Sequence, residues 1–237
     1  MIGTELKEEK QHYKYPKIHH VGDNETEGLF NDKIIVQEKI DGANFQFQVF
    51  QGKIVFGSRG LKLDHNAAGW QKQISYVMKL YAEHPDYFSP QLVYYAEAMI
   101  KHTLVYDYDA HPPLIGFDIM DKQTELLLKP HVSRGEFEKI GIPFVNQIFE
   151  KEGSHVKFEE LKTLVDKELK SAYGLEAEGI VIKNYHRLNK YGRPLLAKIV
   201  KDNFKERNKL AFSGLKELRD AERQMVEEFA TPARIRK

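Results

Sequence analysis

The order of strand-like and helix-like segments restricts the fold of this sequence more than any other feature. Apolar or alternating segments typical of strands occupy residues 33–39, 43–50, 53–58, 92–99, 114–120, 178–184 and 195–200. Apolar residues at helical spacing predict helices over residues 66–83, 133–140 and 157–170. Because these segments follow one another without a regular βαβ alternation, the sequence predicts an α+β fold with largely antiparallel sheets.

Two local patterns support this division. Gln51-Gly52 lies between two strand-like segments and is typical of a hairpin turn. In the segment 66–83, apolar residues spaced by three and four predict one buried stripe, made of Trp70, Ile74, Val77, Met78 and Tyr81. Pro85 marks the expected end of that helix.

The chain has 237 residues, enough for one large domain with an appendage. We expect residues 1–204 to form the main domain and residues 205–237 to form a short C-terminal helical extension. That last segment is highly charged, with a thin apolar seam formed by Leu215, Leu218, Met225 and Phe229.

Composition excludes several classes of function. The chain has no cysteine, which rules out disulfides, cysteine-type zinc sites and thiol nucleophiles. The formal net charge is +1, so the total charge neither indicates nor excludes a local basic surface for a polyanion. The N-terminus lacks a signal-like apolar stretch and no segment is long enough to span a bilayer. We expect a soluble, cytoplasmic protein with no membrane partner.

The most informative motif is Glu38-Lys39-Ile40-Asp41-Gly42-Ala43-Asn44. A lysine at the end of a probable strand is followed by Asp-Gly, and Gly42 permits a tight turn where another residue would be strained. The alternative is a surface lysine beside a turn, since a four-residue pattern often occurs by chance.

Further charged residues lie inside other apolar segments. They are Arg59 after a strand, Glu97, Asp118, Glu178, Lys183, Lys198 and Lys201. Buried charges are costly unless they are paired, so this series predicts one polar cleft shared between the sheets. The glycine-rich fingerprints of P-loop and Rossmann proteins are absent. A nucleotide bound here would therefore be held by side chains.

This order of motifs resembles the covalent nucleotidyltransferase superfamily, which comprises polynucleotide ligases and mRNA capping enzymes. The resemblance covers about residues 37–206 and implies that residues 1–204 are a nucleotidyltransferase (adenylation) domain. It implies that Lys39 attacks the α-phosphate of ATP to form lysyl-AMP, that AMP moves to a 5′-phosphate end, and that a 3′-hydroxyl then displaces it.

The same resemblance implies roles for the other residues. The phosphate end would contain Lys198 and Lys201, with Arg59 nearby, and Glu178 would place a divalent metal, Mg²⁺ or Mn²⁺. Around the nucleoside it implies that Glu38 contacts the base edge, Glu97 the ribose and Phe117 the face of adenine. It implies that Asn44 and Lys183 also contact the nucleotide. Alternatives remain: Phe117 as a core aromatic, and Glu97 as a structural ion pair.

Asn44 gives the motif K-x-D-G-x-N, which resembles the RNA ligase 2 group, whereas DNA ligases and capping enzymes usually carry Arg there. RNA is thus the expected partner, as a nicked duplex or as RNA/DNA hybrid ends. Because of Asp41, a minimal DNA ligase remains one alternative interpretation. A non-catalytic nucleic-acid-binding relative is a second alternative. This sequence departs from the usual motifs of the family at Ala96 and in the spacing of Lys198 and Lys201. Of these two lysines, Lys198 is the better supported.

A lysine is a nucleophile only without its proton, and its ordinary pKa is about 10.4. We expect burial and the cations Lys198, Lys201 and Arg59 to lower the pKa of Lys39.

Overall fold

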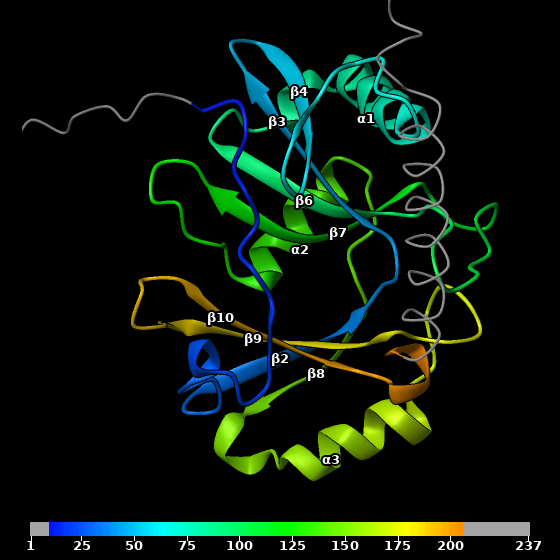
Figure 1. Cartoon of the computed structure of the whole chain (residues 1–237). Coiled ribbons are helices and arrows are strands. Elements are labelled where there is room, and N and C mark those ends of the chain that lie inside the picture. The colour runs from blue at the N-terminus through cyan, green and yellow to red at the C-terminus, as the bar shows by residue number, and fades with distance from the viewer. Residues whose placement is uncertain (1–9, 206–237) are drawn as a thin grey trace, which may run out of the picture.

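The computed structural model describes residues 10–205, which form two five-stranded sheets stacked face to face (Figure 1). The lower sheet in that view has the order β1 (His19–His20), β10 (Pro194–Val200), β9 (Gly179–Leu188), β2 (Lys33–Lys39) and β8 (Gln147–Glu152). The upper sheet has the order β5 (Lys62–Leu63), β4 (Lys53–Ser58), β3 (Ala43–Phe50), β6 (Leu92–Ala98) and β7 (Leu114–Asp121).

All strand pairs are antiparallel except β1 with β10. Gln51 and Gly52 both have positive φ and connect β3 to β4, so the predicted hairpin is confirmed. Strand β2 belongs to the lower sheet and β3 to the upper one. The chain therefore crosses between the sheets at Ile40–Gly42, directly after Lys39.

Each sheet has its own helical cover (Figure 1). Helices α1 (Gln71–Glu83) and α2 (Pro130–Lys139) pack on the upper sheet in a core that includes Ile74, Val77 and Phe137. Helix α3 (Phe158–Thr163) continues into a π-helical turn, Leu164–Glu168, and covers the lower sheet. Short 3-10 turns lie at Asn24–Thr26, Pro85–Tyr87 and Gly153–His155. A third, smaller core lies between the sheets and consists of Tyr13, Tyr15, Val93, Tyr95, Met120 and Leu196.

The predicted α+β class with largely antiparallel sheets is confirmed, but three local predictions differ from the structure. Helix α1 begins at Gln71 rather than at 66, because residues 66–69 form turns and Gly69 has a φ of +81°. The expected 157–170 helix is divided between α3 and the π-helical turn. Strand β8, which was not predicted, is an edge strand with three half-buried residues and three exposed ones.

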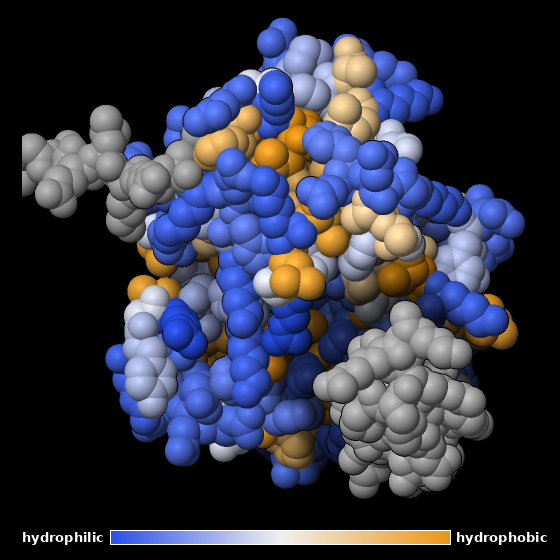
Figure 2. All heavy atoms as spheres, turned by 45° about the horizontal axis from the view of Figure 1, so that its top comes forward, coloured by the Kyte–Doolittle hydropathy of each residue, from blue (hydrophilic) through white to orange (hydrophobic). Residues whose placement is uncertain are grey.

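The expected C-terminal extension lies outside the described residues from position 206 onward. Within residues 10–205, no helix is long and apolar enough to cross a membrane. Figure 2 shows one face of the molecule, on which hydrophilic residues predominate and hydrophobic residues gather toward the middle.

Candidate active site

The candidate site is built by the alternation of side chains along the strands that face each other. On β2, Ile34 and Val36 pack under the lower sheet, so Gln37 and Lys39 point into the space between the sheets. Lys39 and Gln37 line a cavity of about 420 Å³, counted with its open solvent. The other lining residues come from both sheets and the N-terminal segment: Tyr15, Ile18, Glu38, Ile40, Glu97, Phe117, Val145, Val181 and Lys183.

Lys39 forms an ion pair across the lower sheet. Its Nζ donates to Oε2 of Glu178 at 2.6 Å, with side-chain exposures of 22% for the lysine and 8% for the glutamate. Lys39 pairs with Gly179 in the register of β2 and β9, which brings Glu178 beside it. The two residues are 139 positions apart in sequence.

The crossing after Lys39 is fixed by close packing. A Cβ on Gly42 would lie 2.4 Å from the carbonyl oxygen of Ala98, so a side chain has no room. We expected Gly42 for its freedom in a turn, but its φ is not positive; the need is for space. Asp41 is held from the other side: its Oδ2 accepts from the Leu104 N–H at 2.6 Å, and its Oδ1 lies 2.7 Å from Nδ1 of His102.

The charge around Lys39 is negative, which corrects our expectation for its pKa. Burial acts to lower the Lys39 pKa, but the carboxylates of Glu178, Glu97 and Asp41 act together to raise it above its ordinary value. Burial and the nearby Glu178 raise the pKa of Glu97 to about 7, although Lys39 opposes them. The predicted lowering is therefore wrong for the protein without a bound ligand, because carboxylates rather than cations dominate near the amine.

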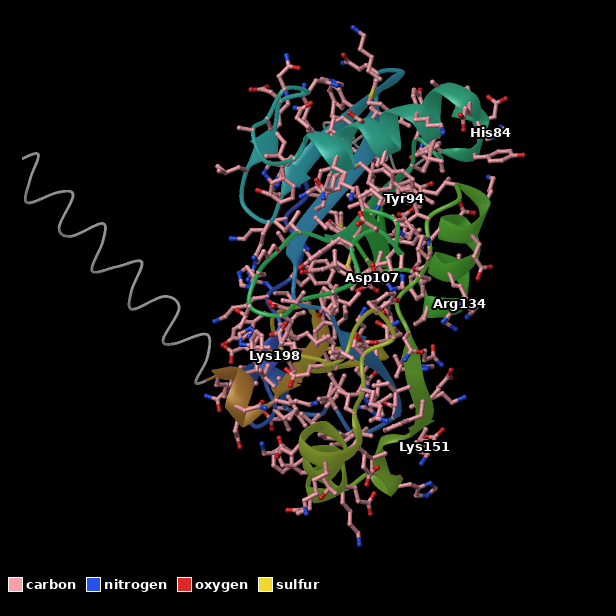
Figure 3. The ribbon with its side chains drawn as sticks, turned by 90° about the vertical axis from the view of Figure 1, so that its right-hand side faces the viewer. His84, Tyr94, Asp107, Arg134, Lys151 and Lys198 are labelled. Atoms are coloured by element: carbon pink, nitrogen blue, oxygen red, sulfur yellow. The ribbon has the colours of Figure 1, made fainter. Side chains whose placement is uncertain are left out.

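Lys198 lies near Lys39 and Glu178. Its pKa is lowered by burial and by the positive charges of Lys39 and Arg59. Arg59 is exposed at the end of β4. Figure 3 shows Lys198 on one side of the molecule, level with the space between the sheets, and Arg134 on the other. Lys201 is directed elsewhere, since its Nζ donates to the carbonyl oxygen of Leu169 at 2.9 Å. The structure thus groups Lys198 and Arg59 with Lys39 and gives Lys201 a backbone contact.

Phe117 lies at a β-bulge. Tyr95 pairs with Asp118 and Ala96 with Gly116, which leaves Phe117 as the extra residue. Consecutive strand residues normally point to opposite faces, but a bulge re-aims one of them. Phe117 accordingly lines the cavity while Asp118 also faces the space between the sheets.

Asp118 and Lys183 form a buried ion pair at the inner end of the cavity. The Lys183 Nζ donates to Asp118 Oδ2 at 2.7 Å and to the Phe117 carbonyl oxygen at 2.9 Å. The hydroxyls of Tyr15 and Tyr185 also donate to Asp118. Burial lowers the pKa of Lys183, and Asp118 opposes that shift. The ammonium lies 5.4 Å from the centre of the Phe117 ring, so this network supports the aromatic wall.

Glu38 and Asn44 are both close to the cavity but are engaged differently. The Glu38 carboxylate accepts from Ser171 Oγ at 2.5 Å and from the Ala172 N–H at 3.0 Å. Burial raises its pKa, and these hydrogen bonds oppose the shift. Each of its two oxygens thus accepts one hydrogen bond from the protein. Asn44 pairs with Glu97 across β3 and β6, and its Oδ1 is buried without a hydrogen-bond partner.

Sequence reasoning missed Gln37. Its side chain is 1% exposed and lines the cavity. Two signals were present in the sequence: Gln37 directly follows the apolar run Ile34–Val36, and it lies two positions before Lys39, on the same face.

The residues at the site fit a divalent metal through carboxylate oxygen. In addition to burial, the charges of Glu178 and Asp41 raise the pKa of Glu97, and the charge of Asp41 raises that of Glu178. A cation would offset this repulsion. No group of three or more His, Cys, Asp or Glu side chains arranged for a metal occurs in the described part of the chain. Mg²⁺ is often held by only one or two carboxylates together with substrate phosphates and water, which is compatible with Glu178 as a ligand.

Comparison with known proteins agrees with this geometry. Residues 32–200 match the family model described as RNA ligase. The solved structure of Naegleria gruberi RNA ligase with PPi superposes with a TM-score of 0.63 at 17% identity, covering 85% of this chain and 59% of that one. Mutants of that ligase with ATP and Mn and with AMP and Mn each give a TM-score of 0.62, at 16% and 17% identity, with the same coverage. The chain thus spans 59% of the length of the ligase structure. No curated protein matches it by sequence.

The fold is that of the nucleotidyltransferase domain found in the N. gruberi ligase. Because the family model matches most of the sequence, the chain belongs to the RNA ligase family.

Proposed function

We propose that this chain is an ATP-dependent RNA ligase that joins 5′-phosphate and 3′-hydroxyl ends through a covalent lysyl-AMP intermediate. The observation that carries the proposal is the position of the Lys39 amine, held by Glu178 at 2.6 Å in a cavity that also contains Phe117. N. gruberi RNA ligase has been solved with ATP and Mn and with PPi, which fits this substrate.

In the first step the lone pair of Lys39 Nζ attacks the α-phosphorus of ATP. A P–N bond forms, the bond from the α-phosphorus to the bridging oxygen of the β-phosphate breaks, and pyrophosphate leaves. The ammonium proton must be lost first, and the carboxylate of Glu178, in direct contact with it, is positioned to accept it. Because three carboxylates raise the Lys39 pKa, this deprotonation is costly until their charge is offset.

Glu178 would hold a divalent metal, which when bound would supply that positive charge and polarise the phosphate oxygens. Lys198 and Arg59 stabilise negative charge at the same end of the cavity. Burial and the nearby positive charges of Lys39 and Arg59 lower the pKa of Lys198, which supports its position beside them.

At the nucleoside end, Phe117 provides an aromatic wall for adenine, and the Asp118–Lys183 pair behind it keeps the ring in place. Glu97, in hydrogen-bond contact with the Gly42 backbone, faces the cavity where the ribose would lie. Glu38 acts through the protein: by anchoring Ser171 and Ala172 it positions the strand that carries Lys39.

In the later steps a 5′-phosphate oxygen of RNA attacks the lysyl-AMP phosphorus and the P–N bond breaks, which regenerates the amine. The 3′-hydroxyl oxygen then attacks the 5′-phosphorus, loses its proton, and displaces AMP. The membership of the RNA ligase family supports RNA as the substrate, presented as a nicked duplex or as hybrid ends.

The decisive experiment incubates the protein with α-labelled ATP and Mg²⁺ and resolves it on a denaturing gel. The wild type should retain label in an acid-labile, alkali-stable bond, and Lys39→Ala should retain none. Lys33→Ala is the matched control, because Lys33 lies on the same strand and forms an exposed ion pair with Glu150; it should label normally. Undiminished labelling of Lys39→Ala would refute the assignment of the nucleophile.

A further inference from the structure

A second cavity lies behind the nucleotide cavity, on the same face of the lower sheet. On β2, Lys39 lines the nucleotide cavity, whereas Lys33 and Ile35 line the second one. These three residues are spaced by even numbers along the strand and therefore share one face. Strand β9 divides in the same way, with Lys183 in the first cavity and Tyr185 in the second. The inner face of the lower sheet is thus the floor of both cavities.

The second cavity is large and basic. Its volume is about 1140 Å³, counted with its open solvent. Glu150 is the only acid among the lining residues that the structure describes, and it pairs with Lys33 at 3.4 Å. The charges of Lys129 and Arg134 are therefore left to act on a ligand. The charged and titratable lining residues come from the start of α2 and from β2, β8 and β9: Lys129, His131, Arg134, Lys33, Glu150 and His186.

Both of these cations are accessible to a ligand. Lys129 is exposed and Arg134 is half-buried, and neither forms a salt bridge within residues 10–205. The Arg134 guanidinium lies over the ring of Phe144, 5.1 Å from its centre, on the side of the molecule opposite Lys198 (Figure 3). Stacking of this kind holds the plane of an arginine while its N–H groups remain free, and they can bind a phosphate in pairs.

The start of α2 favours a bound anion at the same place. Helix α2 begins at Pro130, has no side-chain cap and has no acidic residue in its first turn. Lys129 and Pro130, at this end of the helix, both line the cavity. The N-terminal end of a helix carries a partial positive charge, which here adds to the charges of the side chains. A cleft lined by charge of one sign concentrates ligands of the opposite sign.

The ATP of the proposed reaction does not reach this cavity. The hydroxyl of Tyr185 donates to Asp118, whose carboxylate also binds Lys183, and this network is the wall between the two cavities. Lys33 lies six residues before Lys39, about 20 Å along the strand. An RNA strand is long enough to cover that distance, because a duplex strand carries one phosphate about every 3.4 Å.

We infer that the second cavity binds backbone phosphates of the RNA substrate, at a distance from the break that is sealed. Lys129 and Arg134 contact these phosphates, and each contact releases counterions from the RNA, so that binding weakens as the salt concentration rises. The inference rests on the proposed function only in taking RNA as the substrate. It assigns Lys129 and Arg134 to RNA binding and not to adenylylation.

Removing both charges tests the inference. Each lost phosphate contact should reduce the slope of log K against log salt by about 0.7–0.9. The double variant Lys129→Gln/Arg134→Gln should therefore bind a nicked RNA duplex about 25- to 60-fold more weakly at about 0.1 M salt, with a slope reduced by about 1.4–1.8. Fluorescence anisotropy over a salt series measures both values, with a 3′-deoxy end at the break so that the duplex is not sealed. Should the double variant fold poorly, Lys129→Gln alone repeats the test with a loss of about five- to eightfold.

Two variants provide matched controls. Lys139→Gln removes one charge from the last turn of the same helix, outside the cavity, where the ammonium lies 5.8 Å from the centre of the Tyr87 ring. It should leave the RNA affinity and the slope unchanged. Lys129→Arg/Arg134→Lys keeps both charges and should keep the wild-type slope. All of these variants should form lysyl-AMP at the wild-type rate, because the two cavities are separate.

Wild-type RNA affinity in the double variant would overturn the assignment, and it is the result expected if the cavity holds a small phosphate compound instead. A loss in Lys139→Gln equal to that in Lys129→Gln would overturn it as well, since any surface charge would then serve. Slower adenylylation in the double variant would show that the two cations act through the nucleotide site. Adduct formation tests the proposed function separately: a wild type that forms no adduct, but whose RNA binding depends on Lys129 and Arg134, would refute the lysyl-AMP mechanism and leave this site standing.

Discussion

Replacing Glu97 by Gln should stabilise the ligand-free protein at high pH and much less at low pH. The pKa of Glu97 is about 7 in the folded protein, from an ordinary 4.5, with burial as the largest cause. Between these two values the folded state holds a proton that the unfolded state has lost, so the stability of the wild type falls as the pH rises. A shift of this size corresponds to roughly 3 kcal/mol.

Glutamine cannot ionise, so the Glu97→Gln variant avoids this cost. We expect it to gain roughly 3 kcal/mol over the wild type as the pH rises from 4.5 to above 7, with little gain below 4.5. Urea unfolding at pH 5 and pH 8 measures most of the difference. The single tryptophan, Trp70, is a suitable probe because it stacks on Phe45 at 5.7 Å in the core of the upper sheet.

Glu150→Gln is the control for this experiment. Glu150 is exposed and pairs with Lys33 at 3.4 Å, and such surface pairs contribute about 0–1 kcal/mol. A Glu97→Gln effect that stays constant between pH 5 and pH 8 would refute the reasoning, since it would show that ionisation of Glu97 does not oppose folding.

Three further predictions concern the same cleft. Asp118→Asn should lower the free energy of unfolding by about 3–5 kcal/mol, because it leaves the Lys183 ammonium buried without its counter-charge; a loss below 1 kcal/mol, as in an exposed pair, would contradict this. Lys198→Ala should slow adenylylation by at least about a hundredfold but slow sealing of a pre-adenylylated strand less, and equal losses in the two assays would exclude action through the triphosphate. Phe117→Leu should weaken ATP binding by roughly 1–3 kcal/mol; normal binding in a destabilised variant would make Phe117 a core residue.

The pKa of Lys39 has a consequence for any ligase mechanism on this fold. Burial opposes positive charge on Lys39, but the surrounding carboxylates, above all Glu178, outweigh it and favour the ammonium form in the ligand-free protein. For the proposed lysyl-AMP reaction, bound positive charge must therefore offset the carboxylates before the Lys39 amine can attack.

The sequence by itself determined most of the strands and the order of the charged motifs. Apolar alternation and a positive-φ turn are local properties, so the β3–β4 hairpin was predictable at Gln51-Gly52. The edge strand β8 (Gln147–Glu152) was not, because only its first half is partly buried and its exposed second half needs no apolar pattern. The Lys39 motif was visible because it lies in one continuous segment.

Only the tertiary structure decided what each polar residue does. The partner of Lys39 lies 139 residues away, and the sign of its pKa shift depends on carboxylates from three separate segments. Strand alternation aims Gln37 into the cavity and leaves the Glu38 oxygens on Ser171 and Ala172. Electrostatic and hydrogen-bond energies depend on distance and burial in space, and neither quantity exists until the two sheets have come together.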